Sequence, residues 1–370
     1  MTDPNWKNEE RSGDALQSLY RRYGYIPYKM SRFEEYDLYV RNKDFLVSDQ
    51  IITFSDRSGR LLALKPDVTL SIVKNAPEQP GVVQKVYYQE NVYRDYREIL
   101  QAGLECVGDL GDYEIAEVVL LAVKSLQQLG DRWVLDISHM GLLAAVMDSS
   151  GLSAEAQNLA MEYLHRKNYH QLKALCQNNG AWEKLSAIAA CRGGREALEQ
   201  ISQLLTTREE CAALQQLQGL WEILEAAGCS DSVRLDFSVG NNMRYYSGVV
   251  FRGYLEGIPA SVLSGGQYDK LPRKMGRNAK AIGFAVYLDL LENRNREADA
   301  FHVETLILHD GTADPLELMT AAEEASGNGT VLVTRTFPKK RSLSESLQPP
   351  SQLPERLEVK VATLPFPWSR

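Results

Sequence analysis

The segment VVQKVYYQENVYRDYREILQAGLECVG (residues 82–108) decides the fold. Residues 82–94 and 99–107 are rich in valine, isoleucine, leucine and tyrosine, a composition typical of strands. Very few residues separate the two runs, so we expect neighbouring strands that run antiparallel. Residues 82–108 therefore predict an antiparallel meander as the centre of the molecule.

The flanking sequence adds helices and further strands. Helical spacing of apolar residues predicts helices at 12–25 and 112–129, and a turn at 56–59 predicts a hairpin within 45–65. The remaining expectations are strands at 133–138, 233–239, 249–255 and 259–263, a glycine-rich turn at 264–269 and a helix around 283–291. The predicted fold class is α+β, an antiparallel sheet with flanking helices.

The chain divides by composition into a large and a small part. Residues 150–228 show helical spacing almost throughout, which predicts a helical insertion between strands. The expected domains are a catalytic-type domain at 1–292 containing the insertion 150–228, a polar linker at 293–301, and a truncated C-terminal α/β domain at 302–370. Within the last of these, residues 342–354 predict a disordered loop.

Composition excludes several classes of protein. The chain has 370 residues and a formal net charge of -8, so no general attraction to nucleic acid is expected. Its five cysteines form no CxxC pair, which argues against a disulfide framework and a zinc site. No apolar run reaches the roughly 18 residues of a membrane span. We therefore expect a cytoplasmic protein with no membrane, nucleic-acid or metal partner.

Four segments resemble the histidyl-tRNA synthetase family of class II synthetases. They are FSDRSGRLLALKPDVTLSIVK (54–74), YYQENVYRDYREILQAGLECVG (87–108), RYYSGVVF (244–251) followed by SGGQYDKL (264–271), and AIGFAVYLDLL (281–291). They occur in the family's order, around a helical insertion where the family has one, and the resemblance covers about residues 12–292. It implies a class II synthetase-like sheet and an amino-acid pocket.

The resemblance implies contact residues for a histidine ligand. They are Asp67, Thr69, Arg94, Gln101, Glu105, Tyr246 and Tyr268. Asp67 and Thr69 match the family residues that hold the amino group, and Arg94 matches an arginine that meets a carboxylate or phosphate. Gln101 and Glu105 lie four positions apart in a strand, so they face the same way.

Tyr246 and Tyr268 match the tyrosines around the imidazole. Each residue alone also fits a solvent-facing strand position or a core tyrosine, and the whole set is what favours a pocket.

The ATP half of the family's site is altered. Asn241, Tyr287 and Leu290 stand where the family has an arginine, a glycine and a second arginine. The loop that covers ATP is reduced to residues 95–96 before 97–98. Because phosphoryl chemistry needs cations aimed at the phosphates, the resemblance implies little adenylation, no catalytic residue and no cofactor.

A retained pocket without ATP machinery resembles the regulatory subunit of ATP phosphoribosyltransferase. That resemblance implies a noncatalytic protein in the first step of histidine biosynthesis, partnered by a short-form catalytic subunit. L-histidine is the expected ligand, and a homodimer within a hetero-oligomer is the expected assembly. A true histidine-tRNA ligase and a free-standing histidine-sensing protein are the alternatives. His139 and Cys106 are expected to have structural roles.

Overall fold

The computed structural model describes residues 8–46, 50–77, 79, 81–177, 181–239, 245–291, 305–309, 314–327, 331–335 and 360–362. The described residues up to 291 belong to one compact unit, and those from 305 onward belong to a second.

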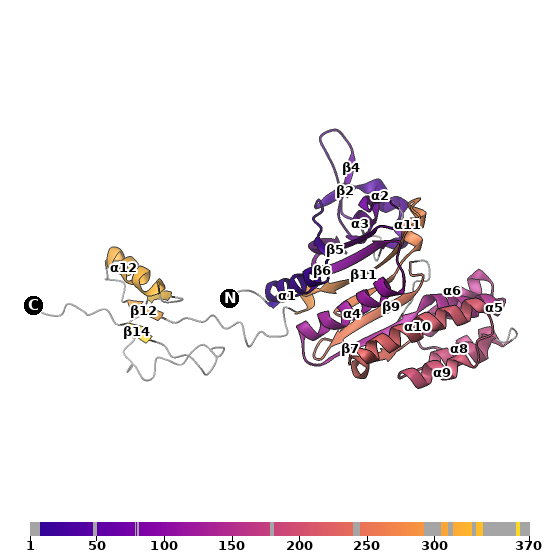
Figure 1. Ribbon diagram of the computed structural model, residues 1–370. Coiled ribbons are helices and arrows are strands. Elements are labelled where there is room, and N and C mark those ends of the chain that lie inside the picture. The colour runs from indigo at the N-terminus through magenta and orange to yellow at the C-terminus, as the bar shows by residue number, and fades with distance from the viewer. Residues whose placement is uncertain are drawn as a thin grey trace, which may run out of the picture. The chain divides into compact units, whose positions relative to one another are not determined.

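The first unit is built on an eight-stranded sheet (Figure 1). In order across the sheet, the strands are β1 (Ile26–Pro27), β5 (Val83–Arg94), β6 (Arg97–Gly108), β11 (Lys280–Tyr287), β10 (Leu263–Gln267), β9 (Val249–Leu255), β7 (Trp133–His139) and β8 (Val233–Leu235). The outer pairs β1–β5 and β7–β8 are parallel. All other neighbours are antiparallel, which confirms the predicted fold class.

The connection between β5 and β6 is as short as a hairpin allows. Arg94 pairs with Arg97, so only Asp95 and Tyr96 lie between the strands. Both have a positive φ, 51° and 59°, which is the backbone of a type I′ turn and matches the twist of the strands. The predicted strands are confirmed, and the second begins at Arg97.

Two layers cover the sheet. On one face, α1 (Asn8–Arg22) packs against β5 and β6, and α4 (Asp112–Leu129) packs against β9, β10 and β11. Ala102, Leu104 and Cys106 point from β6 into this larger core, as expected for Cys106. On the opposite face lie α3 (Thr69–Asn75), α11 (Lys270–Lys274) and α2 (Tyr36–Arg41), around a smaller core.

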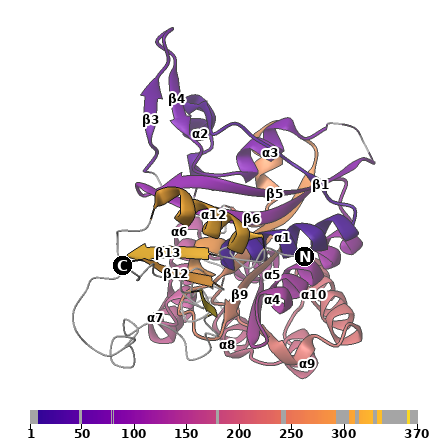
Figure 2. The same cartoon turned by 90° about the vertical axis from the view of Figure 1, so that its left-hand side faces the viewer.

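A second small sheet belongs to this smaller layer. It has the order β2 (Phe33–Glu35), β4 (Leu61–Leu64), β3 (Thr53–Ser55), and a short 3-10 helix (Lys43–Phe45) lies between β2 and β3 in the chain. The predicted hairpin turn is present, because Asp56 Oδ1 accepts hydrogen bonds from the backbone N–H groups of Ser58 and Arg60. The hairpin β3–β4 projects from the rest of the unit (Figure 2).

The helices after β7 gather beside the sheet (Figure 1). They are α5 (Met140–Ser149), α6 (Ala154–His165), α7 (Tyr169–Cys176), α8 (Ala181–Ala190), α9 (Arg195–Ser202) and α10 (Arg208–Ala226). Ser153 and Thr207 cap the starts of α6 and α10, each accepting a backbone hydrogen bond. A 3-10 helix (Ser230–Ser232) leads back to β8.

Four sequence predictions were wrong in the last part of this unit. Residues 264–267 form most of strand β10 and are not a turn, and the strand expected at 259–263 is absent. Residues 280–287 form strand β11 instead of a helix, followed by a 3-10 helix (Leu288–Leu291). Strand β8 ends at Leu235, because Asp236 Oδ1 accepts bonds from Ser238 and closes a turn.

The second unit contains a three-stranded parallel sheet and a helix. Its strands lie in the order β13 (Val331–Arg335), β12 (Thr305–His309), β14 (Lys360–Ala362), and α12 (Pro315–Ser326) packs on β13. The predicted linker 293–301 and loop 342–354 lie outside the described residues. Within the described part of the chain, no helix combines the length and apolar character needed to cross a bilayer.

Candidate ligand-binding site

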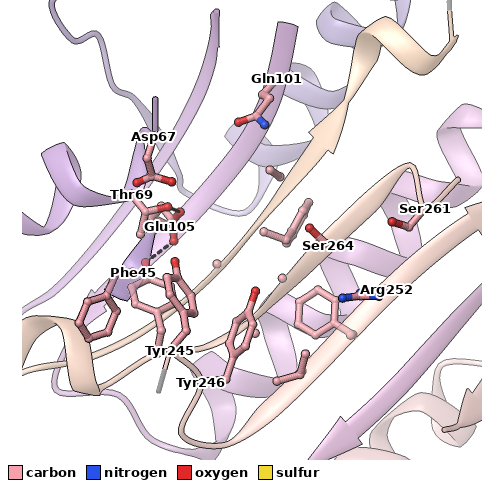
Figure 3. A pocket seen from close by; sticks show the side chains of 18 of the residues that line it. Phe45, Asp67, Thr69, Gln101, Glu105, Tyr245, Tyr246, Arg252, Ser261 and Ser264 are labelled. Atoms are coloured by element: carbon pink, nitrogen blue, oxygen red, sulfur yellow. Dashed lines mark hydrogen bonds between the residues drawn. The ribbon is translucent and has the colours of Figure 1, made fainter. Parts of the chain in front are cut away.

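A cavity of about 590 Å³ opens on the sheet face opposite α1 and α4 (Figure 3). All seven residues predicted from the resemblance line it: Asp67, Thr69, Arg94, Gln101, Glu105, Tyr246 and Tyr268. They come from the start of α3, the hairpin β5–β6 and the segments around β9 and β10. Folding thus brings together side chains that are up to about two hundred positions apart in sequence.

Glu105 lies at the centre of the polar end of the cavity. It is 2% exposed, and its Oε1 accepts a 2.7 Å hydrogen bond from Thr69 Oγ1. Its Oε2 accepts a hydrogen bond from the Tyr268 hydroxyl. Burial raises the pKa of Glu105 to about 8, although both hydrogen bonds favour the ionised form. Glu105 is therefore poised to gain or lose a proton near neutral pH.

Asp67 is the second carboxylate of the cavity. Its Oδ1 accepts a 2.8 Å hydrogen bond from the backbone N–H of Leu70, which holds the side chain over the first turn of α3. Burial raises the pKa of Asp67, while this hydrogen bond and the charge of Arg94 oppose the rise. Asp67 and Arg94 thus provide opposite charges within electrostatic reach of each other.

Two polar groups at this end have no hydrogen-bond partner in the part of the chain that the structure describes. Arg94 Nε and Gln101 Nε2 are buried and donate to no acceptor among the described residues, and both side chains line the cavity. An unsatisfied buried donor costs about 1–3 kcal/mol. A ligand with acceptor atoms would relieve that cost, so these two donors are available to such a ligand.

Aromatic rings form one wall of the cavity. The ring centroid of Tyr245 lies 4.6 Å from that of Tyr246 and 5.6 Å from that of Tyr268. Phe45 continues the row, 5.6 Å from Tyr245. A flat, polarisable ring such as imidazole fits against a wall of this kind.

Sequence reasoning missed Tyr245, Phe45 and Arg252, which also line the cavity. Tyr245 lies before the start of β9, where successive side chains need not point to opposite faces. Its ring therefore lies on the same side as that of Tyr246. Phe45 lies in a 3-10 helix far from the motifs, and the sequence contains no signal for it. Arg252 faces Ser264 across β9 and β10, and a correct placement of β10 would have revealed it.

The altered family positions carry no charge. Tyr287 lines the cavity, and its hydroxyl lies 2.8 Å from Ser264 Oγ. Leu290 is partly buried and packs against the larger core. Asn241 lies outside the described residues. The β5–β6 turn has two residues and is too short to reach over the cavity.

His139 is a structural residue at the end of β7. Its Nδ1 accepts a 3.0 Å hydrogen bond from the backbone N–H of Leu142, so it caps α5. Its Nε2 donates to Gln216 Oε1 at 2.8 Å, which ties the sheet to α10. Burial lowers the pKa of His139. Among the described residues, no group of three or more His, Cys, Asp or Glu side chains is placed to hold a metal ion.

Comparison with known proteins matches this architecture to one family. The histidyl-tRNA synthetase family profile matches residues 1–291. A relative from Halalkalibacterium halodurans, named ATP phosphoribosyltransferase regulatory subunit, is 31% identical over 351 residues, which cover 90% of this chain and 88% of the relative. A Clostridium kluyveri relative with the same name is 30% identical over 300 residues, which cover 76% of this chain and 77% of the relative.

A crystal structure from Bacillus halodurans gives the same result. It is described as an ATP phosphoribosyltransferase regulatory subunit/histidyl-tRNA synthetase, and it aligns with a TM-score of 0.75 at 26% identity. The match covers 99% of this chain and 97% of the other. The chain therefore belongs to the histidyl-tRNA synthetase family and, within it, to the ATP phosphoribosyltransferase regulatory subunits.

Proposed function

We propose that this chain is the noncatalytic regulatory subunit of an ATP phosphoribosyltransferase, required for the activity of a short-form catalytic subunit in the first step of L-histidine biosynthesis. The names of its relatives support a regulatory role beside a partner enzyme. We further propose that L-histidine binds in the cavity and brings about feedback inhibition. The cytoplasm is the proposed compartment, and a homodimer within a hetero-oligomer is the proposed assembly.

The charges of the cavity suit a free amino acid. Asp67 receives the ammonium group, and Thr69 holds Glu105 close by. Arg94, whose charge already acts on Asp67, receives the carboxylate, which is bonded to the same carbon as the ammonium group. The zwitterionic end of the ligand therefore meets one acidic and one basic side chain.

The imidazole ring then lies between Glu105 and the aromatic wall. Tyr246 and Tyr268 flank the ring, and Glu105 pairs with one ring nitrogen. Gln101 lies four residues from Glu105 along β6, about 13 Å of strand, so its free Nε2 donates to the carboxylate of the ligand and not to the ring. A side chain without a ring nitrogen would not pair with Glu105, which costs affinity. The same contacts give selectivity for histidine.

One observation carries the noncatalytic part of the proposal. The cavity keeps both carboxylates and the aromatic wall, while Leu290 packs into the core and Tyr287 fills the place of a glycine. Losing one transition-state cation costs roughly 3 kcal/mol, or a factor of a hundred or more in rate. A ligand that binds two states of a complex unequally shifts the balance between them, so a binding site suffices for regulation.

The test of the ligand site is calorimetry of the full chain with L-histidine. Asp67→Asn and Glu105→Gln each replace a carboxyl group by an amide with little change of shape, and both should weaken binding about tenfold or more. Glu256→Gln is the matched control, because Glu256 is exposed and pairs with Arg132 outside the cavity. Equal affinity in all four proteins would show that the ligand binds elsewhere.

The test of the enzyme alternative is histidine-dependent exchange of pyrophosphate into ATP. We expect no exchange above the buffer background. Measurable exchange would identify a functional adenylation site and overturn the noncatalytic role. Copurification with a short-form catalytic subunit, followed by light scattering, measures the assembly; a chain that stays alone would contradict the proposed partnership.

A further inference from the structure

The cavity has a second polar end, formed by strands β9, β10 and β11. Arg252 on β9 is the direct cross-strand neighbour of Ser264 on β10, so the two side chains lie on the same face of the sheet. Ser264 Oγ lies 2.8 Å from the Tyr287 hydroxyl on β11. In Figure 3, Arg252, Ser261 and Ser264 lie together on one side of Tyr246. This end offers one cation and several hydroxyl groups.

Arg252 is half-buried. No ion pair or hydrogen bond joins it to a carboxylate within the part of the chain that the structure describes. Its neighbour on the other side, Asp136 on β7, instead accepts a 3.0 Å hydrogen bond from Arg234 Nε. The carboxylates that line the cavity, Asp67 and Glu105, lie beyond Tyr246. A partly desolvated guanidinium in this position attracts an anion from solution.

This end is too far from the amino-acid residues to serve the same carboxylate. Glu105 is on β6 and Arg252 is on β9, with β11 and β10 between them. Three steps between strands amount to about 14 Å of backbone separation. Tyr246 lies between the two ends, and its pKa, raised mainly by burial, also responds to the nearby Tyr287 and Arg252. The carboxylate of an amino acid whose ammonium group is at Asp67 therefore meets Arg94 and not Arg252.

We propose that Arg252, Ser264 and Tyr287 form an oxyanion subsite that takes a phosphate group and can be filled together with the amino-acid pocket. A guanidinium can donate two parallel hydrogen bonds to phosphate oxygens, and the hydroxyl pair supplies a further donor. The chain has a formal net charge of -8, so binding of a phosphate requires these local groups and does not follow from general attraction. The subsite does not depend on which amino acid occupies the other end.

The experiment is calorimetric titration of the full chain with inorganic phosphate at constant ionic strength. Wild type should bind one phosphate per chain, and Arg252→Gln should weaken binding at least about tenfold, since it removes a charge-assisted hydrogen bond. Arg252→Lys keeps the charge but loses the paired geometry, so its affinity should be intermediate. Arg132→Gln, an exposed arginine paired with Glu256, is the control and should leave phosphate affinity unchanged.

A second titration, with L-histidine, separates this subsite from the proposed function. Arg252→Gln should keep histidine affinity within about twofold of wild type, because its contacts lie beyond Tyr246. Unchanged phosphate affinity in Arg252→Gln, or no phosphate binding by wild type, would overturn the subsite. Loss of histidine and phosphate binding together would place Arg252 in the amino-acid site and also overturn it. Phosphate binding without any histidine binding by wild type would contradict the proposed function alone.

Discussion

Glu105 and Gly283 face each other across β6 and β11, and the absence of a side chain at Gly283 leaves the space that the Glu105 carboxylate occupies. A Cβ at position 283 would overlap Glu105 Oε2. Gly283→Ala should therefore displace the carboxylate from Thr69 and Tyr268 and weaken histidine binding about tenfold or more. It should also lower the free energy of unfolding by about 1–3 kcal/mol, measured by urea denaturation.

A second glycine provides the control for this variant. Gly219 lies inside α10, and a Cβ at that position meets no atom within 4 Å. Gly219→Ala should stabilise the protein by roughly 0.5–1 kcal/mol and leave histidine affinity unchanged, because alanine favours the helix. Histidine affinity that is equal in Gly283→Ala and wild type would show that Glu105 does not contact the ligand.

Histidine binding should depend on pH in a way that Glu105 determines. Burial raises the pKa of Glu105 to about 8, while a free imidazole titrates near 6.5. In the complex, the Glu105 carboxyl group and the imidazole of the ligand share one proton. Below about pH 6.5 both partners carry a proton before binding, so one must be released and affinity falls as pH falls. Above about pH 8 neither carries one, so one must be taken up and affinity falls as pH rises.

Calorimetry between pH 5 and 9 measures this profile. Wild type should show a plateau between about pH 6.5 and 8, with declines on both sides approaching tenfold per pH unit. Glu105→Gln cannot take up the proton, so its affinity, although lower, should decline much less than that of wild type between pH 8 and 9, where only the amino group of the ligand begins to lose its proton. A flat wild-type profile would contradict a direct pairing between the ring and Glu105.

His139 should contribute to stability and not to ligand binding. His139→Ala removes the cap of α5 and the bond to Gln216, so it should lower the free energy of unfolding by about 1–3 kcal/mol at pH 8. Burial lowers the folded pKa of His139 below 6.5, so the unfolded chain takes up this proton first. The contribution of neutral His139 to the free energy of unfolding is complete above pH 6.5 and is lost as the pH falls through the folded pKa.

Denaturation of wild type and His139→Ala at several pH values measures this difference. The difference in the free energy of unfolding between wild type and His139→Ala should become smaller at acid pH. Gln216→Ala, which keeps the cap of α5 and removes the partner of His139 Nε2 together with an exposed hydrogen bond to Asp112, should have a smaller effect. A change of histidine affinity in His139→Ala without a change in stability would show a different role for this residue.

Restoring one arginine should not restore adenylation. Leu290→Arg supplies a cation at one family position. However, Tyr287 still occupies the position of the family's glycine in the cavity, and the turn at Asp95 and Tyr96 is still too short to cover ATP. Wild type and Leu290→Arg should both lack histidine-dependent pyrophosphate exchange. Exchange by the single variant would mean that one missing cation accounts for the inactive site.

Much of the fold follows from patterns within short segments of sequence. Strands β5 and β9 and helix α4 match their predicted ranges to within a residue, because alternation or helical spacing continues over several turns or pairs. The seven cavity residues lie together, although only the resemblance connected them. Spacing alone gives which face of a strand a side chain occupies, but not which strands are neighbours.

Strands β10 and β11 were missed for a tertiary reason. Gly265 looks like a turn residue, but a Cβ there would overlap the Gly283 carbonyl and Phe284, so the glycine marks a close approach of strands. Residues 280–287 are almost continuously apolar because β11 is buried between β6 and β10. A buried strand of this kind and a buried helix have the same pattern. Because β10 was not predicted, the position of Arg252 opposite Ser264 was not predicted either.

The regulatory role itself is tested by reconstituting ATP phosphoribosyltransferase activity. A short-form catalytic subunit is assayed alone, with this chain, and with this chain plus L-histidine; Glu105→Gln serves as the variant that should bind histidine poorly. We expect this chain to be required for full activity, histidine to inhibit the complex, and Glu105→Gln to keep the activation but lose most of the inhibition. Full activity of the catalytic subunit without this chain would contradict the regulatory role.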